Sequence, residues 1–263
     1  MALISAHQCG APKGAPDSVI PEALEAVLTT ECDYVEVDVR RTADGALVVR
    51  HDARVAVGHG HHPRVATLSL DELRQVEPAL TTYDEVLDRL HGRKRLHLDL
   101  KFGSPRQLYE AGTPEKCYEI AAVERAISVL GADKVVVTTG NDHAVAALRA
   151  WSAAEYPDLL VGLSIGKSRA GLPLWEQLRG RLSELFPGRR VLGSNANLVV
   201  ANHWLAFLGV ARWTAKRGLP LVVWTVDGRR GLTRWLGDSR AWLVTTNQTL
   251  LAIEIRRRLD GRR

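Results

Sequence analysis

The sequence predicts an α/β fold, a TIM-type (β/α)8 barrel with a small β-ribbon at its mouth. Short apolar, β-branched runs alternate with longer helical patterns along the chain, as is typical of repeated βα units around a parallel sheet. The 263 residues are 46% hydrophobic and 25% charged, which suits one large domain or two small ones. Because no low-complexity linker or internal repeat divides the chain, we expect a single barrel domain over residues 1–263.

Nine apolar runs are predicted to form strands, one more than such a barrel requires. The third run is the extra one, because residues 41–45 are too few for a parallel crossover from the second. We therefore expect Asp44-Gly45 to form the turn of an antiparallel ribbon, with His51-Asp52 at its returning end. The predicted strands are Leu3–Ala6, Tyr34–Val39, Leu47–Arg50, Leu96–Leu100, Val135–Thr139, Leu159–Ser164, Val191–Asn195, Leu221–Val226 and Trp242–Thr245.

Helical periodicity and capping residues predict the connecting helices. Ser69 or Asp71 can cap the helix that contains Leu73, and Asn141 can cap the helix that follows it. The predicted helices are Pro21–Leu28, Leu70–Val76, Tyr83–Leu90, Lys116–Leu130, Asp142–Ala150, Leu174–Leu185, His203–Lys216, Arg230–Leu236 and Thr249–Leu259.

Two of the predicted strands carry charged side chains on one face. Alternate residues of a strand point to opposite sides, so residues 34–40 place valines on one face and polar groups on the other. Residues 96–101 repeat this division with leucines. The polar faces carry Glu36, Asp38, Arg40, His97, Asp99 and Lys101. Buried carboxylates are costly unless they are neutralised, so the three acids need either a metal ion or ion pairs with Arg40 and Lys101.

The same polar residues fall at the carboxyl ends of their strands, where barrels of this type carry their chemistry. Glu36, Asp38, Asp99 and Lys101 all lie there, and His7 ends the first strand in the same way. A single histidine at a strand end is usually structural. Its position at the same rim as three acids and a lysine favours a functional role.

These residues form an ordered set that resembles a known family. The set is His7, Glu36-x-Asp38, His51-Asp52, Asp99-x-Lys101 and Trp224-Thr225-Val226. It resembles the glycerophosphodiester phosphodiesterase family, whose members are similar barrels that use a divalent metal and two histidines. The resemblance extends from Ile4 to Asn247, and its most specific part is the block from Glu36 to Asp52. It implies that Glu36, Asp38 and Asp99 hold the metal and that His7 and His51 are the acid–base pair.

The resemblance also implies residues on the substrate side of the site. Lys101 is expected to face the phosphate, and Trp224 to line the mouth beside the substrate. Asp52 is expected to orient His51 or a backbone turn.

The chain departs from the family at its opening motifs. The usual His-Arg-Gly reads His7-Gln8-Cys9-Gly10, and the usual Pro-Glu-Asn-Thr reads Pro16-Asp17-Ser18-Val19. Gln8 then takes the place of an arginine that donates two hydrogen bonds to phosphate, with Asp17 opposite it. By strand alternation Cys9 shares a side with His7, but metal-dependent phosphoryl chemistry needs no thiol nucleophile.

The expected activity is that of a metal-dependent phosphodiesterase, which hydrolyses a small glycerophosphodiester-like substrate to an alcohol and a phosphomonoester. Hard carboxylate ligands favour Mg2+ or Ca2+, which neutralises charge on the phosphate. One histidine takes the proton from the attacking hydroxyl or water, and the other protonates the leaving alkoxide. The sequence leaves open which is which.

Two other functions fit the same residues. A lyase would use the substrate's adjacent hydroxyl as nucleophile and release a cyclic phosphate, and Asp99 in place of the family's usual Glu resembles that branch. A non-catalytic phosphodiester-binding barrel fits the changes at Gln8 and at residues 16–19.

Three remaining features suggest no second metal or catalytic site. We interpret Gly58–His62 as a substrate-facing or solvated loop, because its histidines lack the spacing of a metal site. Ser194, Asn195 and Asn197 are expected to contact the substrate's head group from a strand end. The net charge is +5, and we interpret the basic residues near the end of the sequence as a solvated helix end with favourable charge.

The expected setting is the cytoplasm, with a small-molecule phosphodiester as partner and the oligomeric state open. No apolar run reaches the ~20 residues of a spanning helix, so we expect no stable membrane insertion. No nucleic-acid-binding motif accompanies the basic residues, so no nucleic-acid partner is expected. Three cysteines without paired spacing indicate reduced thiols.

Overall fold

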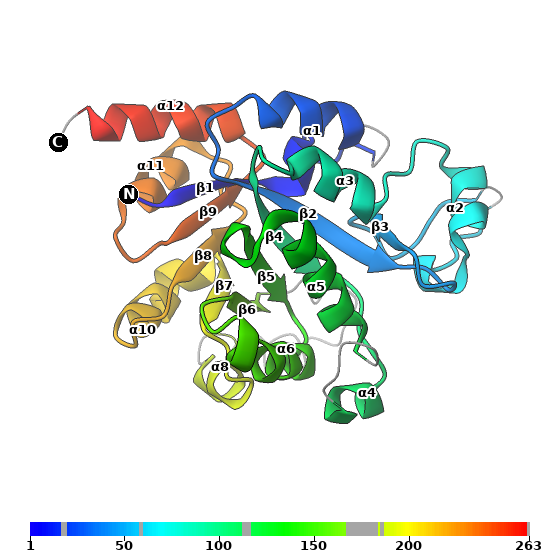
Figure 1. The fold of residues 1–263 in the computed structure, drawn as a ribbon. Coiled ribbons are helices and arrows are strands. Elements are labelled where there is room, and N and C mark those ends of the chain that lie inside the picture. Colours follow the sequence, from blue (N-terminus) through cyan, green and yellow to red (C-terminus); the bar gives the residue numbers. More distant parts are fainter. Residues whose placement is uncertain (17–19, 58–59, 112–116, 167–183, 185–186, 262–263) are drawn as a thin grey trace.

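Eight parallel strands close into a barrel surrounded by helices, as the sequence predicts (Figure 1). The computed structural model describes residues 1–16, 20–57, 60–111, 117–166, 184 and 187–261. The barrel order is β1-β9-β8-β7-β6-β5-β4-β2, and pairing of β1 with β2 closes it. The barrel strands are β1 Leu3–Ala6, β2 Tyr34–Arg41, β4 Arg95–Leu100, β5 Val135–Thr139, β6 Leu160–Ile165, β7 Leu198–Asn202, β8 Leu221–Trp224 and β9 Leu243–Thr246.

The strand that lies outside the barrel forms the predicted ribbon. Strand β3 (Leu47–Val49) pairs antiparallel with β2, Val39 lying opposite Val49 and Arg41 opposite Leu47. Gly45 supplies the positive φ of the turn, at 92°. The Asp44 side chain accepts a hydrogen bond from the Leu70 backbone N–H at 3.1 Å, which ties the turn to the next helix.

Helices follow most of the barrel strands, and their caps agree with the predicted ones. Ser69 caps α2 in a reciprocal capping box, and Asn141 caps α6 through the N–H groups of His143 and Ala144. The helices are α1 Ile20–Leu28, α2 Leu70–Val76, α3 Tyr83–Leu90, α4 Arg106–Ala111, α5 Tyr118–Leu130, α6 Asp142–Glu155, α8 Gly188–Gly193, α9 His203–Leu205, α10 Ala211–Ala215, α11 Arg229–Gly237 and α12 Thr249–Asp260. Single 3-10 turns occupy His7–Gly10, Val65–Thr67 and Ala132–Lys134.

One predicted helix is interrupted in the structure, and another lies almost entirely outside the described residues. The prediction His203–Lys216 covers α9, a π-helical segment at Ala206–Val210 and α10, with Gly209 at a φ of 154° interrupting the helical backbone. The prediction Leu174–Leu185 lies outside the described residues except at position 184. Helix α4 was not predicted.

The predicted strand at Val191–Asn195 was wrong. Its first residues belong to helix α8, and the seventh strand along the chain is β7, whose β-branched run is longer and fully buried. Asn197 lies just before β7 and bonds to the backbone of Val161 and Leu159, at the amino ends of the strands. The expected head-group contacts of Ser194, Asn195 and Asn197 are therefore wrong, since these residues lie at the end of the barrel opposite its mouth.

The core has two main layers that follow strand alternation. Outward-facing residues such as Val35 and Val37 pack against the helices in the larger cluster. A smaller cluster fills the amino-terminal half of the barrel interior with Tyr34, Val136, Leu198, Val200, Val222 and Leu243. With that half closed by apolar side chains, inward-facing polar residues are confined to the carboxyl-terminal half. In the described part of the chain, no helix has both the length and the hydropathy to cross a membrane.

Candidate active site

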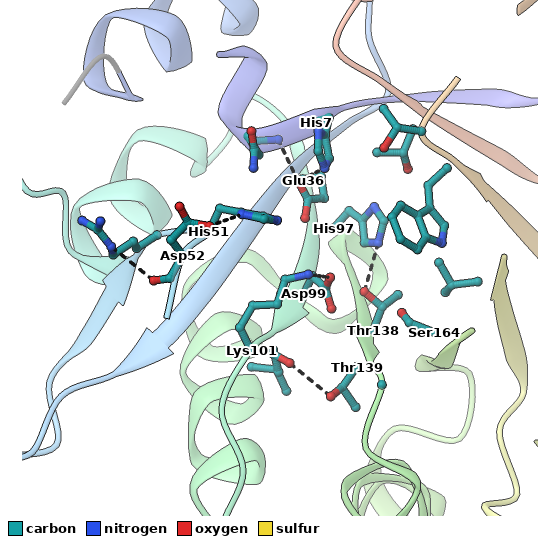
Figure 2. Close-up of a pocket in the computed structure, with 18 of the residues that line it drawn as sticks. His7, Glu36, His51, Asp52, His97, Asp99, Lys101, Thr138, Thr139 and Ser164 are labelled. Carbon is teal, nitrogen blue, oxygen red and sulfur yellow. Dashed lines mark hydrogen bonds and ion pairs between the residues drawn. The ribbon is translucent and has the colours of Figure 1, made fainter. Parts of the chain in front are cut away.

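A cavity of about 1260 Å3 opens at the carboxyl ends of the barrel strands (Figure 2). Each barrel strand, or the residue just after it, contributes a side chain to its lining. These residues are His7, Glu36, Asp99, Thr138, Ser164, Asn202, Trp224 and Thr245. Gln8, His51, Asp52 and Lys101 also line it, and Asp38 lines an adjoining small cavity. The structure thus brings together at one mouth every predicted catalytic, metal-binding and substrate-facing residue of the family motif that it describes.

Two buried carboxylates from β2 lie at the centre of the site. Glu36 and Asp38 are 3% and 2% exposed. Burial, reinforced by the charges of Asp38 and Asp99, holds the pKa of Glu36 well above its usual value. The backbone N–H of Gln8 donates to Glu36 Oε2 at 2.7 Å, which fixes the carboxyl group but does not offset its burial.

The Lys101 ammonium forms ion pairs with both Asp99, the third acid of the site, and Asp38. Its Nζ lies 2.5 Å from Asp99 Oδ2 and 3.1 Å from Asp38 Oδ1. Burial alone would lower the pKa of Lys101, but the charges of Asp99, Asp38 and Glu36 raise it well above the usual range. Burial acts against Asp38 too, yet the charge of Lys101 above all lowers the pKa of its carboxyl group. Two carboxylates therefore converge on one positive charge.

Arg40 plays a different part from Lys101. Its guanidinium donates to the backbone carbonyl oxygens of His51 and Lys101, each at 3.0 Å. These bonds connect the end of β3 to the end of β4. The ion-pair alternative raised by the sequence is thus realised by Lys101, while Arg40 positions backbone around the site.

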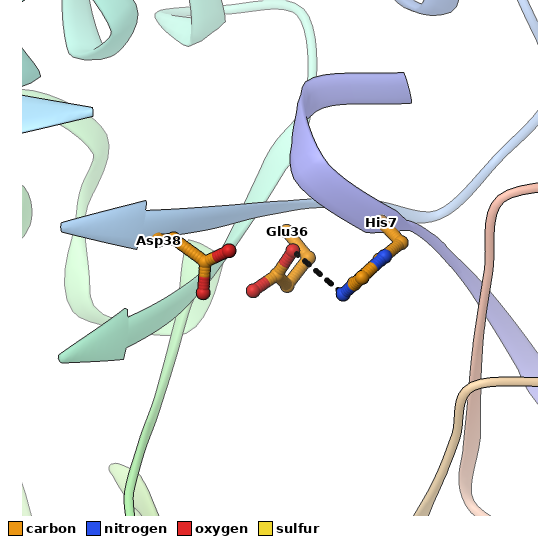
Figure 3. Close-up of side chains that lie close together, drawn as sticks. All are labelled: His7, Glu36 and Asp38. Atoms are coloured by element: carbon orange, nitrogen blue, oxygen red, sulfur yellow. Dashed lines mark ion pairs between the residues drawn. The ribbon is translucent and has the colours of Figure 1, made fainter. Parts of the chain in front are cut away.

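His7 completes a group of potential metal ligands with Glu36 and Asp38 (Figure 3). One ligand atom from each residue lies within 4.8 Å of the others, and His7 Nε2 is 3.9 Å from Glu36 Oε2. Burial lowers the pKa of His7, which favours the neutral ring. An imidazole nitrogen and two carboxylates form a donor set that suits a divalent cation. Asp99 is bonded to Lys101 instead and is not in this group.

The turn after His7 sends its neighbours in different directions. Gln8 and Cys9 have positive φ values of 48° and 56°. Gln8 Nε2 lies 3.5 Å from Asp38 Oδ2, whereas Cys9 is fully buried in the core beneath the helices. The expectation that Cys9 shares a side with His7 was wrong, because the chain leaves the strand at Ala6 and alternation ends there.

His51 approaches the acids from the ribbon (Figure 2). Its Nδ1 lies 2.9 Å from Asp52 Oδ1, and its side chain is 51% exposed. Its charge contributes to lowering the pKa of both His7 and Asp38. The site therefore holds one buried and one solvent-accessible histidine.

The side chains that β5 to β9 themselves point into the cavity are uncharged; Asp227, which follows β8, is the acidic residue beside them. His97 lies between Ser5 Oγ and Thr138 Oγ1 at 3.1 and 3.2 Å, and burial lowers its pKa to about 3. It is a neutral structural residue. Trp224 Nε1 and Thr245 Oγ1 are buried and make no hydrogen bond within the described part of the chain.

Some expected residues fall elsewhere and some site residues were not foreseen. Asp17 and His59 lie outside the described residues, and His61 and His62 are exposed. Sequence reasoning missed Asp227, which follows β8, and included Asn247, which follows β9, in the family resemblance without giving it a role. Their position after barrel strands was the available signal.

The closed barrel, with acids and histidines converging at its mouth, defines a (β/α)8-barrel protein with a candidate metal-assisted active site. The model of the glycerophosphoryl diester phosphodiesterase family matches residues 14–250. The chain therefore belongs to the glycerophosphoryl diester phosphodiesterase family, which confirms the resemblance found in the sequence. Membership implies a phosphodiesterase of the hydrolase class. No curated protein matches the chain.

Solved structures of this family share the fold. A glycerophosphodiester phosphodiesterase of Parabacteroides distasonis superposes with a TM-score of 0.70 at 18% identity, covering 98% of each chain. That of Thermotoga maritima gives 0.66 at 16%, covering 97% of this chain and 99% of its own. A phosphodiesterase of Oleispira antarctica, solved with its product sn-glycerol-3-phosphate, gives 0.68 at 15%, covering 97% and 96%. At these identities the comparison establishes the fold.

Proposed function

We propose that this chain is a metal-dependent phosphodiesterase that hydrolyses a small glycerophosphodiester-like substrate to an alcohol and a phosphomonoester. The observation that carries the proposal is the convergence of Glu36, Asp38 and His7 within 4.8 Å at the mouth of the barrel. The Oleispira relative, which binds sn-glycerol-3-phosphate as its product, supports a substrate of this class.

Glu36 and Asp38 are the proposed centre of the metal site, with Asp99 as the third carboxylate. His7 lies within reach of the same point but is proposed as the base rather than as a ligand, because its Nε2 lone pair can serve only one of the two roles. Their oxygen atoms suit Mg2+ or Ca2+. Asp38 is shared by both groupings in the structure, the one with His7 and the one with Lys101 and Asp99. When bound, the cation would neutralise charge on the non-bridging phosphate oxygens. The elevated pKa of Glu36 fits this role, because burial and, after it, the neighbouring charges of Asp38 and Asp99 oppose its ionised form, which a bound cation would favour.

The two histidines are proposed to move the protons. Burial favours the neutral form of His7, so its Nε2 accepts the proton of the attacking water or hydroxyl as the new P–O bond forms. His51 is accessible to solvent and oriented by Asp52, so it gives a proton to the alkoxide as the old P–O bond breaks. In this proposal the buried histidine is the base and the exposed one is the acid.

The remaining contacts position the substrate. Lys101 supplies a permanent positive charge beside the acids, facing the phosphate. Gln8 lies beside Asp38, where its amide donates to a phosphate oxygen as a weaker substitute for the family's arginine. Trp224 forms part of the wall against which the organic arm of the substrate packs.

A metal-by-substrate activity screen tests the proposal. Metal-free protein is incubated with Mg2+, Ca2+ or EDTA and with glycerophosphodiesters of glycerol, ethanolamine and choline, and products are identified by phosphorus NMR. We expect a phosphomonoester to appear only with a divalent cation. A persistent cyclic phosphate would show that the enzyme catalyses the lyase reaction instead of hydrolysis. Absence of turnover for every substrate and metal would favour the binding barrel.

A further inference from the structure

A chain of hydrogen bonds from residues that follow β8 and β9 holds the His7 ring. Asn247, which follows β9, places its Oδ1 2.9 Å from His7 Nδ1. Its Nδ2 donates to Asp227 Oδ2 at 2.9 Å, and its backbone N–H donates to Asp227 Oδ1, also at 2.9 Å. Thr246 Oγ1 adds a third donor to Asp227 Oδ1 at 3.3 Å.

The donors and acceptors of this chain fix the direction of each bond. Three donors converge on the Asp227 carboxylate, which only accepts hydrogen bonds when ionised. The Asn247 amide therefore turns its NH2 group to Asp227 and its oxygen to His7. Because that oxygen is an acceptor, the proton of the neutral His7 ring must be on Nδ1.

The tautomer decides what faces the reaction centre. With the proton on Nδ1, His7 Nε2 carries a lone pair, and this atom lies 3.9 Å from Glu36 Oε2 on the side of the acids. A ring protonated on Nε2 would present a donor there and could accept no proton from a nucleophile. Partners behind a reactive histidine commonly set its tautomer in this way.

We propose that Asp227 and Asn247 are positioning residues that hold His7 as the Nδ1–H tautomer and so direct its Nε2 lone pair into the site. The inference rests on the proposed function, in which His7 accepts a proton. It adds two residues to the site, both contributed by segments that follow β8 and β9.

The test exchanges the two side chains. In Asp227→Asn, an amide faces the Asn247 amide, so Asn247 is released to turn its NH2 group toward His7 and favour the Nε2–H tautomer. In the double variant Asp227→Asn/Asn247→Asp, the carboxylate introduced at position 247 again accepts from His7 Nδ1–H. The amide introduced at position 227 donates to that carboxylate and accepts from the backbone N–H of position 247. The bonds that link His7 to positions 247 and 227 are restored, with the negative charge moved from position 227 to position 247.

Two readouts separate positioning from folding. Nitrogen NMR of the metal-free protein at about pH 8, above the usual histidine pKa, reports the His7 tautomer, with His7→Gln assigning the signal. Kinetics report kcat and KM separately. We expect Asp227→Asn to shift the tautomer and lower kcat about 10- to 100-fold with KM little changed. The double variant is expected to recover the tautomer and most of kcat.

Asp238→Asn is the matched control, since Asp238 bonds Arg240 at the opposite end of the barrel and undergoes the same chemical change. We expect its tautomer signal and kcat to match the unmodified protein. An unchanged tautomer in Asp227→Asn, or a folded double variant no better than the single one, would overturn the inference. The NMR readout needs no turnover, so failure of the proposed phosphodiesterase activity would leave this test intact.

Discussion

The two walls of the cavity differ in charge. One wall, formed from β1, β2 and β4, carries His7, Glu36, Asp38, Asp99 and Lys101 and is called the charged wall here. The opposite wall, formed from β6, β7 and β8, carries Ser164, Asn202 and Trp224 on its strands and is called the neutral wall, since the Asp227 carboxylate after β8 is hydrogen-bonded to Asn247. The difference separates two tasks: the charged wall suits bond breaking at phosphorus, and the neutral wall suits packing of the organic arm.

The largest effects are expected from the histidines on and beside the charged wall. His7→Ala and His51→Ala should each lower kcat about 100- to 10,000-fold, because proton transfer is lost. Steady-state kinetics measure this, with metal binding checked separately. His91→Ala is the control, since this exposed histidine bonds Val129 O near the amino end of β4. A loss of less than about tenfold in both variants would remove the histidines from the proposed chemistry.

Removal of the lysine should destabilise the charged wall itself. Lys101→Met leaves Asp38 and Asp99 without their shared cation, so we expect the metal-free protein to lose about 3 kcal/mol of unfolding free energy in urea titrations. Lys134→Met removes a surface ion pair with Asp133 and should change little. Equal stabilities of the two variants would contradict convergence of the acids on Lys101.

Glu36→Gln is expected to have a smaller effect of opposite sign on stability. The pKa of Glu36 is higher in the folded protein than in the unfolded chain, where it is near 4.5. Its protonated carboxyl therefore contributes its full stability below pH 4.5, and this contribution is lost as the pH rises through the folded-state pKa. The amide avoids that loss. Thermal melts of metal-free protein should therefore show the variant gaining over the unmodified protein as pH rises from about 4.5. A pH-independent difference would show that Glu36 is not strained by burial.

The neutral wall should affect substrate binding more than turnover. Trp224→Phe keeps an aromatic ring but removes the buried Nε1–H, which makes no hydrogen bond within the described residues. The smaller ring also presents less apolar surface to the substrate, and the loss of about 1 kcal/mol of packing should raise KM about fivefold with kcat nearly unchanged. A fall in kcat with constant KM would instead place Trp224 in the chemical step.

The features predicted best from sequence were those set by local pattern. Alternation in residues 34–40 identified the inward acids of β2, and the short link before Leu47 identified the ribbon. The seventh strand was misplaced because a short apolar run at Val191 resembles a strand as well as a helix. Alternation also failed at Cys9, where the chain turns out of β1.

Contacts distant in sequence could not be predicted. His7 and Asn247 are 240 residues apart, and they meet only because β1 and β9 are neighbours in the closed barrel. Likewise, the sequence placed Lys101 near the acids but did not show that it bonds both Asp38 and Asp99. Such bonds depend on side-chain geometry after closure of the barrel.

Calorimetric titration of Mg2+ and Ca2+ into metal-free protein tests most directly whether the charged wall is a divalent-cation site. Asp38→Asn is the decisive variant because Asp38 belongs to both acid groupings. Asp52→Asn is the control, since its carboxylate bonds His51 and is largely exposed. We predict one-site binding in the unmodified protein and in Asp52→Asn, and its loss in Asp38→Asn. Absence of binding in the unmodified protein, or equal binding in Asp38→Asn, would contradict the account.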